Sequence, residues 1–380
     1  MKMNTTPVAG PLPRFLVATL SCLALLTAAC GSGSQSGNSV ANQATATSQA
    51  TATSQATATT RPTTTIRISL IPTTSNAALF LGLSRGYFTD EHVNLDTTFI
   101  ATGSSVLAPL ISGSLDIGQG GPSAGLFNTI NEAPGKVKVI GSVQTAVPGE
   151  AARNQGVLVD AKLGITDART AVAKRLHVAI LAKGQNMEYY TRLWLDKSGQ
   201  ANATLGYEES SDVVLVNAQN PATIYAALKT GQLQSGLLVT PLSQRAISEG
   251  LAVPLFWLNE VSPGASTNLF MASAAFLKAN GDAATAFLRA YSRSAKAAES
   301  ALAAGPSSDA FKELISVTAK YLTTDAATLT VSPGYSVDVN ADDLKAMGAY
   351  FAKIGRLSGP TPPALSDYVD LSYLQAAQGR

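Results

Sequence analysis

Short β-rich runs alternate with helix-type runs over residues 66–143, and this alternation limits the fold more than any other feature of the chain. Strands are expected at 66–71, 93–100, 115–118 and 137–143, and helices at 76–86, 106–112 and 121–130. Such alternation is typical of parallel βαβ units. The sequence therefore predicts a sheet that is covered by helices.

The same alternation restarts at residue 176. Strands are expected at 176–181, 212–217, 236–240, 252–258 and 268–272, helices at 186–197 and 221–230, and only helices after residue 272. The residues from Ile66 onward, about 315, are enough for two buried cores. We predict an α/β fold of two lobes, each built on a doubly wound sheet, with a helical C-terminal part.

The first 29 residues have the features of a secretory signal peptide. Lys2 and Arg14 accompany an almost unbroken apolar run over residues 15–29, which is too short to span a membrane. The run ends in Ala28-Ala29-Cys30 and resembles the bacterial lipoprotein signal, in which the cysteine is acylated and begins the mature protein. We expect lipidation at Cys30. The alternative is an ordinary secretory signal that leaves Cys30 free.

Residues 30–65 contain almost only small or polar side chains, with a six-residue repeat of the type SQATAT over residues 42–59. A segment with so few large apolar groups cannot offset the entropy cost of ordering. We predict a flexible tether of about 30–35 Å, which holds the folded part at the extracytoplasmic face of the cell membrane. A loose N-terminus without an anchor is the alternative.

Charge and the supply of metal ligands exclude several classes of function. The chain of 380 residues has 27 Lys or Arg and 25 Asp or Glu, and the two basic residues of the signal peptide account for its net charge of +2. A neutral mature chain predicts no nucleic-acid partner. Two cysteines and two histidines are too few for a disulfide framework or a zinc site of several such ligands. We expect no metal and no cofactor.

Several segments, in a fixed order, resemble one known family. They are 79–96, 110–118, 183–186, 226–235 with Pro241 after it, and 277–291. The first contains a Gly-aromatic-aromatic turn at residues 86–88, and the second contains Leu115-Asp116 before a glycine-rich loop. These features are similar to the sulfonate, taurine, nitrate and thiamine-precursor group of ABC-transporter substrate-binding proteins. The resemblance covers about residues 66–300.

The resemblance implies two lobes of the type II periplasmic-binding-protein fold, joined by two crossover strands with the ligand clamped between them. Lobe 1 would comprise residues 66–155 and 263–380, and lobe 2 residues 156–262. It also implies a monomer that delivers a small-molecule ligand to an ABC permease and its ATPase. Many relatives carry acidic residues near the positions of Gln234, Val239 and Thr240, so no role of those acids transfers to this chain.

Candidate ligand-binding residues lie in the loops after the expected strands, because ligands of open α/β sheets bind outside the carboxyl ends of strands, beside helix N-termini. They are Thr74, Ser75, Asn76, Ser104, Ser105, Gln119, Gly121, Ser123, Gln144, Gln185, Asn186 and Thr240. The Ser, Thr and Asn residues have the alternative role of helix N-caps. Asp116 is expected to be structural and to bond backbone in the glycine-rich turn.

These loops contain no Asp, Glu or Arg, and Lys183 is the only charged residue nearby. A cationic ligand would need carboxylates or aromatic rings, and the carboxylate of an amino acid is usually bound by an arginine. A small anion such as a sulfonate fits hydroxyls and helix N-termini, and a neutral heterocycle such as a thiamine pyrimidine precursor fits amides.

We therefore predict a solute-binding lipoprotein of an ABC importer that closes its lobes on a small organic anion. The alternatives of another class are a lipoprotein that senses its ligand without transport and an interaction module with a vestigial cleft. No catalytic residues are expected, because His92 and His177 have no evident motif partners and no nucleophile motif stands out. The alternative to a protein without catalytic residues is a hydrolase or an isomerase.

Overall fold

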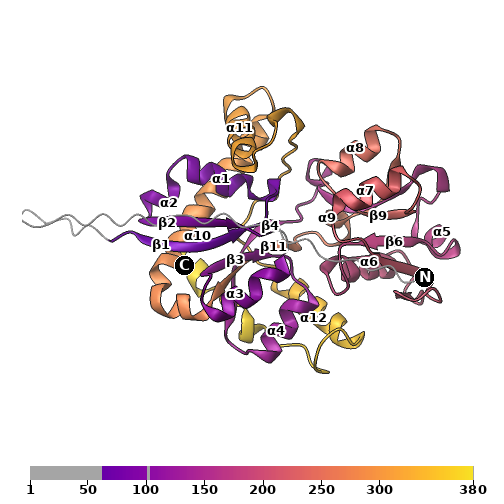
Figure 1. The fold of residues 1–380 in the computed structure, drawn as a ribbon, viewed down its shortest axis with the longest axis horizontal. Coiled ribbons are helices and arrows are strands. Elements are labelled where there is room, and N and C mark those ends of the chain that lie inside the picture. The colour runs from indigo at the N-terminus through magenta and orange to yellow at the C-terminus, as the bar shows by residue number, and fades with distance from the viewer. Residues whose placement is uncertain (1–61, 101–102, 380) are drawn as a thin grey trace, which may run out of the picture. The chain divides into compact units, whose positions relative to one another are not determined.

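A computed structural model describes residues 62–100 and 103–379, and these contain two β-sheets (Figure 1). The strands of the first sheet lie in the order β2-β1-β3-β11-β4. Their bounds are β1 Thr64–Leu70, β2 Val93–Phe99, β3 Ile117–Gly120, β4 Val137–Thr145 and β11 Ser266–Ser273. β1 runs parallel to β2 and β3, whereas β11 runs antiparallel to β3 and β4.

The strands of the second sheet lie in the order β10-β5-β9-β6-β8-β7. Their bounds are β5 Gln155–Asp160, β6 His177–Ile180, β7 Leu205–Gly206, β8 Val213–Asn217, β9 Ser235–Val239 and β10 Ala252–Trp257. β6 is parallel to β8 and β9, whereas β5 is antiparallel to both β9 and β10. The predicted α/β class with two sheets is confirmed.

The strands are not all parallel, in contrast to the parallel units that the sequence predicts. β5 follows β4 of the first sheet and enters the second sheet antiparallel to its neighbours. β11 follows β10 of the second sheet and returns to the first, again antiparallel. The two antiparallel insertions are thus the strands through which the chain leaves one sheet and enters the other.

Helices pack against both faces of the first sheet. Along β11, Leu269 and Met271 belong to one hydrophobic cluster, and Phe270 and Ala272 belong to the other, because successive side chains of a strand point to opposite faces. The helices that cover the sheet are α1 Ala77–Ser84, α2 Tyr87–Asp90, α3 Leu107–Ser112, α4 Ala124–Glu132, α10 Ala274–Ala304, α11 Asp309–Leu322, α12 Ala341–Lys353, α13 Leu365–Tyr368 and α14 Ser372–Ala377.

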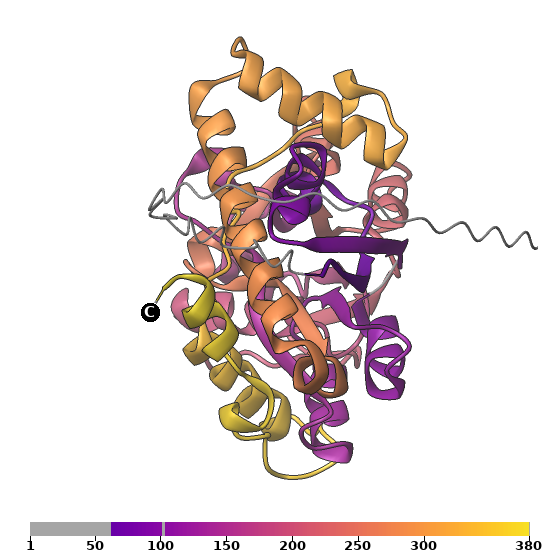
Figure 2. The ribbon, with the colours of Figure 1, turned by 90° about the vertical axis from the view of Figure 1, so that its left-hand side faces the viewer.

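The long helix α10 organises one of these two faces. It packs against α1, α11 and α14, and Figure 2 shows it as the long orange helix beside the sheet. The ring of Phe270 meets the rings of Phe287 and Tyr291 edge-on, with centroids 5.0 and 4.8 Å apart. The predicted helical C-terminal part is therefore confirmed for this stretch, and α10 contributes side chains to the hydrophobic cluster on one face of the first sheet.

The second sheet has its own set of helices. α7 packs on β9, and α8 packs on β5, β9 and β10. The bounds are α5 Ala168–Ala173, α6 Asn186–Lys197, α7 Pro221–Lys229, α8 Leu242–Ser248 and α9 Leu258–Val261. Short 3₁₀ turns complete the described elements: η1 Thr74–Asn76, η2 Gly103–Val106, η3 Glu150–Ala152, η4 Ala161–Leu163 and η5 Ala326–Thr328.

Residues 329–340 are extended, which corrects the expectation that only helices follow residue 272. The segment lies along β4, where the Ser142 N–H donates to Val337 C=O at 2.9 Å and the Thr145 N–H to Gly334 C=O at 2.8 Å. Gly334 has a φ of 121°, and a Cβ there would lie 2.4 Å from the Thr145 carbonyl oxygen. Glycine is required because the segment approaches β4 so closely.

Helix α12 joins the core of the second sheet. Leu344 and Phe351 of α12 belong to the same hydrophobic cluster as Tyr190 and Leu195 of α6 and Phe127 of α4. This continuity means that the C-terminal part of the chain packs against elements of both sheets.

Two buried carboxylates reinforce this packing. Glu188 of α6 has a side chain only 2% exposed, and it accepts hydrogen bonds from Arg356, from Tyr207 OH at 2.9 Å and from the Gly184 N–H at 2.8 Å. Asp343 of α12 accepts from Tyr190 OH at 2.7 Å and from the Ser262 hydroxyl. Burial raises the pKa of Asp343.

Asp116 is structural, as predicted, but its partner is different. It accepts from the Arg67 N–H at 2.8 Å and forms an ion pair with the Arg67 guanidinium. Arg67 also donates to Gly113 C=O at 2.8 Å. The carboxylate therefore connects β1 to the turn before β3, and its partner is Arg67 rather than the glycine-rich loop beyond β3.

The predicted signal peptide, Cys30 and nearly all of the predicted tether lie outside the described residues. β1 begins at Thr64, two residues before the predicted end of the tether. Within the described residues, no helix combines the length and the apolar content that a membrane crossing requires.

Candidate functional site

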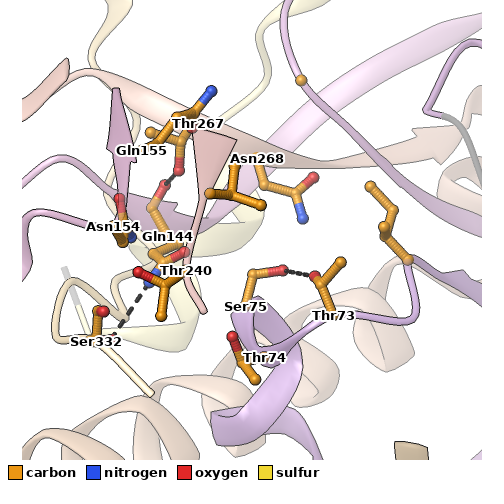
Figure 3. A pocket seen from close by; sticks show the side chains of 13 residues that line it. Thr73, Thr74, Ser75, Gln144, Asn154, Gln155, Thr240, Thr267, Asn268 and Ser332 are labelled. Atoms are coloured by element: carbon orange, nitrogen blue, oxygen red, sulfur yellow. Dashed lines mark hydrogen bonds between the residues drawn. The ribbon is translucent and has the colours of Figure 1, made fainter. Parts of the chain in front are cut away.

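One pocket lies where loops of the first sheet meet the start of β5 and the end of β9 in the second (Figure 3). Its volume is about 180 Å³. The lining residues are Ile71, Thr73, Thr74, Ser75, Gly121, Gln144, Asn154, Gln155, Val239, Thr240, Thr267, Asn268 and Ser332. None of them is ionisable or aromatic, so hydroxyls, amides and backbone groups supply its polarity.

The loop after β1 supplies hydroxyl groups at the beginning of a helix. Thr73 is the N-cap of η1, which continues directly into α1. Its Oγ1 lies 2.6 Å from Ser75 Oγ, so one hydroxyl hydrogen of the pair is left to donate elsewhere. The first N–H groups of a helix have no intrahelical acceptor. Donors therefore collect at this end of the pocket.

Tyr335, in the segment 329–340, is hydrogen-bonded to the loop after β1. Its hydroxyl donates to Thr74 C=O at 2.6 Å. Burial raises the pKa of Tyr335 well above its ordinary value, so the phenol keeps its proton and remains a donor over the physiological range of pH.

Asn76 and Gln119 lie beneath the loop and bond to each other. Gln119 Nε2 donates to Asn76 Oδ1 at 2.7 Å, and Asn76 Nδ2 donates to Gln119 Oε1 at 2.9 Å. Both side chains also bond the backbone of Ile71, and both residues are 0% exposed. They do not line the pocket. Their geometry supports the loop rather than direct contact with a ligand.

The strands that connect the two sheets supply the opposite wall. Gln144 is the penultimate residue of β4, where its side-chain amide donates to Ser332 C=O at 3.4 Å and its own C=O accepts from the Thr267 hydroxyl at 3.0 Å. Thr267 and Asn268 lie in β11. Thr240 Oγ1 and Asn268 Oδ1 are buried and have no hydrogen-bond partner in the structure.

The other predicted site residues lie beside the pocket. Ser123 caps α4 by accepting from the Leu126 N–H at 3.2 Å, and it forms an isolated β-bridge with Gln185, which precedes α6. Asn186, the first residue of α6, lies next to Gly121, because its Nδ2 would be 3.4 Å from a Cβ added there. These contacts bring α4 and α6 together at their N-terminal ends.

Two further candidates are in the loop before α3. Ser105 is exposed and is not among the lining residues. Ser104 belongs to η2, and its side chain is outside the described part of the structure. Of the predicted ligand-binding residues, the pocket thus brings together Thr74, Ser75, Gly121, Gln144 and Thr240.

Sequence reasoning missed Asn154, Gln155, Thr267, Asn268 and Ser332. The first four are amides or hydroxyls close to the predicted ends of lobe 2, and amidic residues at a crossover are the signal that could have identified them. Ser332 carried no such signal, because residues 329–340 were expected to be helical.

Arg153, next to Asn154 in sequence, does not line the pocket and pairs with Glu150 and Glu260, both at 2.8 Å. Lys183 Nζ lies 5.3 Å from the centre of the Tyr207 ring. His177 pairs with Glu209 at 3.4 Å, and neither residue lines the pocket. No group of three or more His, Cys, Asp or Glu in the described residues could hold a metal ion. The lining residues can thus orient and enclose a small molecule by hydrogen bonds.

Comparison with protein families gives a match over most of the folded part. The model described as the NMT1-like family matches residues 59–309. No curated protein matches the chain.

Solved structures with a similar fold include three binding proteins. The alkanesulfonate-binding protein SsuA from Xanthomonas axonopodis pv. citri, bound to MOPS, has a TM-score of 0.62 and 18% identity, covering 82% of this chain and 100% of its own. The periplasmic nitrate-binding protein NrtA from Synechocystis PCC 6803 has a TM-score of 0.62 and 14% identity, covering 83% and 89%.

The periplasmic aliphatic sulphonate-binding protein SsuA from Escherichia coli has a TM-score of 0.61 and 17% identity, covering 79% of this chain and 96% of its own. These likenesses confirm the predicted periplasmic-binding-protein fold. They agree with the group whose motifs the sequence resembles.

Proposed function

The chain belongs to the NMT1-like family, and on that basis we propose that it is the extracytoplasmic solute-binding protein of an ABC importer. A pocket bordered by residues of two sheets suits this role, because a ligand that contacts both stabilises the state in which they close on it. An ABC permease and its ATPase are the proposed partners of a monomeric chain. The alkanesulfonate and nitrate binding of proteins with a similar fold supports this proposal.

The proposed ligand is a small organic anion of the sulfonate type. One observation supports this proposal. The hydroxyls of Thr73 and Ser75, at the start of η1, border a pocket whose lining contains no ionisable side chain. A helix N-terminus with hydroxyls stabilises an anion and offers nothing to neutralise a cation. We assign the pocket no catalytic role.

The amides of Asn154, Gln155 and Asn268 favour a second candidate, a neutral heterocycle such as a pyrimidine. Amide groups present donors and acceptors in the pattern that such a ring requires. The same titration tests both candidates.

The test is isothermal titration calorimetry of the purified protein with ethanesulfonate, nitrate and a neutral pyrimidine. We expect ethanesulfonate to bind with a Kd of about 1–100 μM, within the ceiling of about 1.5 kcal/mol per non-hydrogen atom for very small ligands. Binding of the pyrimidine alone would replace the first candidate by the second. If none of the three compounds binds, the pocket is not the site of a ligand of either type.

The attachment of the protein to the membrane is a further part of the proposal. It comprises a signal peptide over residues 1–29, a lipid on Cys30, a tether over 30–65, and lobes formed by 66–155 with 263–380 and by 156–262. The apolar run that ends at Cys30 supports it, because this is the pattern of a lipoprotein signal.

We expect the Cys30→Ser variant to move from the membrane fraction to the soluble extracytoplasmic fraction, because the serine hydroxyl cannot carry the thioether-linked lipid. Cell fractionation and immunoblotting measure the distribution. Cys22→Ser is the matched control, since Cys22 lies inside the apolar run, and it should stay with the membrane. Retention of Cys30→Ser at the membrane would contradict the lipid anchor.

A further inference from the structure

We propose that a polar latch holds the two proposed lobes together before any ligand is bound. Its residues are Ala124, Gly184, Glu188 and Arg356. The latch sets how much of the ligand-free protein is closed and therefore how tightly a ligand binds. Its role in affinity rests on the proposed function.

A backbone hydrogen bond crosses directly from one lobe to the other. The Ala124 N–H at the start of α4 donates to Gly184 C=O, just before α6, at 2.8 Å. Ser123 and Gln185, the chain neighbours of these two residues, form an antiparallel β-bridge. Both contacts join groups of the chain itself, so they can form whether or not the pocket holds a ligand.

The peptide of Gly184 is oriented for this bond from within the second lobe. Its N–H donates to Glu188 Oε2 at 2.8 Å, and Tyr207 OH donates to the same oxygen at 2.9 Å. Gly184 has a φ of 79°, and a Cβ there would lie 3.0 Å from Ala124 Cβ. Glycine is required both by this φ and by the close approach of α4. The Gly184 C=O is therefore held in place to meet the Ala124 N–H.

Arg356 makes a second contact across the same boundary. Its C=O accepts from Asn128 Nδ2 of α4 at 3.1 Å, while its guanidinium pairs with Glu188 of α6 at 2.9 Å. Glu188 joins the two contacts, because it accepts hydrogen bonds from Gly184 as well as from Arg356. We therefore expect the two contacts to form and break together.

The chemistry of the latch makes it reversible. It consists of a backbone N–H, a carbonyl, a carboxylate and a guanidinium, all of which water solvates when they separate. Hydration thus offsets part of the cost of breaking them, which is not the case for the apolar clusters of the two sheets. Opening at the latch should therefore occur without unfolding of either lobe.

The latch lies beside the pocket without lining it. Gly121, three residues before Ala124, borders the pocket, whereas the latch residues are not among those that line it. The latch therefore changes affinity through the fraction of closed protein and not through contact with the ligand. When a ligand binds only the closed state, its apparent Kd is the Kd of that state divided by the closed fraction.

The variant Ala124→Pro removes the N–H and places the proline ring against Gly184 C=O. The helix should tolerate it, because Ala124 is the first residue of α4 and follows an N-cap with extended backbone, φ −160° and ψ 161°. α7 has a proline at the same helical position, Pro221.

Ala168→Pro is the matched control. Ala168 is buried, begins α5 and follows an N-cap with extended backbone, φ −149° and ψ 171°. α5 lies far from α4 (Figure 1), so the same substitution there leaves the latch intact.

Double electron–electron resonance measures closure without a ligand. The spin labels are attached to Glu132→Cys at the end of α4 and to Glu208→Cys between β7 and β8, two exposed positions, one in each lobe. Cys22 and Cys30, the two cysteines of the chain, are replaced by serine so that only the introduced thiols react.

We expect the short distance of the latched state to be populated in the ligand-free full chain. In Ala124→Pro, the ratio of the short to the long distance should fall about fivefold or more, the effect of losing one typical hydrogen bond. Ala168→Pro should keep the ratio of the unmodified protein. In calorimetry, ethanesulfonate should bind Ala124→Pro more weakly by the factor by which the closed fraction falls.

A ligand-free protein that shows only the long distance would overturn the inference. It would also be overturned by a ratio that Ala124→Pro leaves unchanged, by an equal fall in Ala168→Pro, or by an unchanged affinity for ethanesulfonate in spite of a lower closed fraction. None of these outcomes contradicts the proposed function, since ethanesulfonate can still bind. If no sulfonate binds, the proposed ligand class fails, and the distances in the ligand-free protein alone decide whether the latch exists.

Discussion

Replacing Ser75 by aspartate should weaken the binding of ethanesulfonate at least 100-fold and leave the protein folded. The carboxylate would stand where we place the anion, beside Thr73 at the start of η1. Two like charges about 4 Å apart repel by about 4 kcal/mol at an effective dielectric constant of about 20, and a factor of 100 in affinity needs only about 2.8 kcal/mol. Calorimetry measures the effect.

The fold should tolerate this change, because an acidic side chain in the first turn of a helix is favourable. Ser308→Asp is the matched control, since Ser308 is the N-cap of α11 and lies outside the pocket. It introduces the same charge and should leave binding within a factor of two. If Ser75→Asp binds ethanesulfonate within tenfold of the unmodified protein, the anion is not held at the start of η1.

The largest loss of stability is expected from Glu188→Ala. This carboxylate is nearly inaccessible, and its removal leaves Arg356, Tyr207 OH and the Gly184 N–H without their acceptor. Breaking a buried ion pair from one side typically costs about 3–5 kcal/mol, so the free energy of unfolding should fall by about that amount. Chemical denaturation with urea, followed by circular dichroism, measures it.

Glu209→Ala is the matched control for this loss. Glu209 is also an acid paired with a basic residue, His177, but its side chain is 79% exposed. Exposed pairs contribute about 0–1 kcal/mol, so this variant should unfold close to the unmodified protein. A loss below 1 kcal/mol in Glu188→Ala would show that Arg356 and its neighbours find other partners.

The sequence predicted the positions of helices and strands better than it predicted which strands pair and in which direction. The helix predicted at residues 186–197 coincides with α6, because a polar residue precedes it and Gly199 follows its last turn. The two antiparallel strands β5 and β11 could not be foreseen from local alternation. Their direction depends on where the chain crosses between sheets, which is a tertiary property.

The sequence likewise predicted only some of the residues that line the pocket. The amides of Asn76 and Gln119 have the right chemistry for a ligand, yet these residues, 43 positions apart, bond each other. Ser332 reaches the pocket only because residues 329–340 pair with β4 instead of forming a helix. Residue type predicts what a side chain can bond, and only the fold decides which partner is available.

The position of the pocket on the connecting strands has a mechanical consequence. Gln144, Gln155, Thr267 and Asn268 belong to the strands at which the chain passes between the sheets, so any rotation of one sheet against the other has its pivot at their contacts. A bond at a pivot has a short lever arm and changes little as the sheets rotate. In the proposed closure, contacts at Ser75, in the loop after β1, would therefore contribute more torque than contacts at Thr240, whose N–H donates to Asn154 C=O at 2.8 Å beside β5.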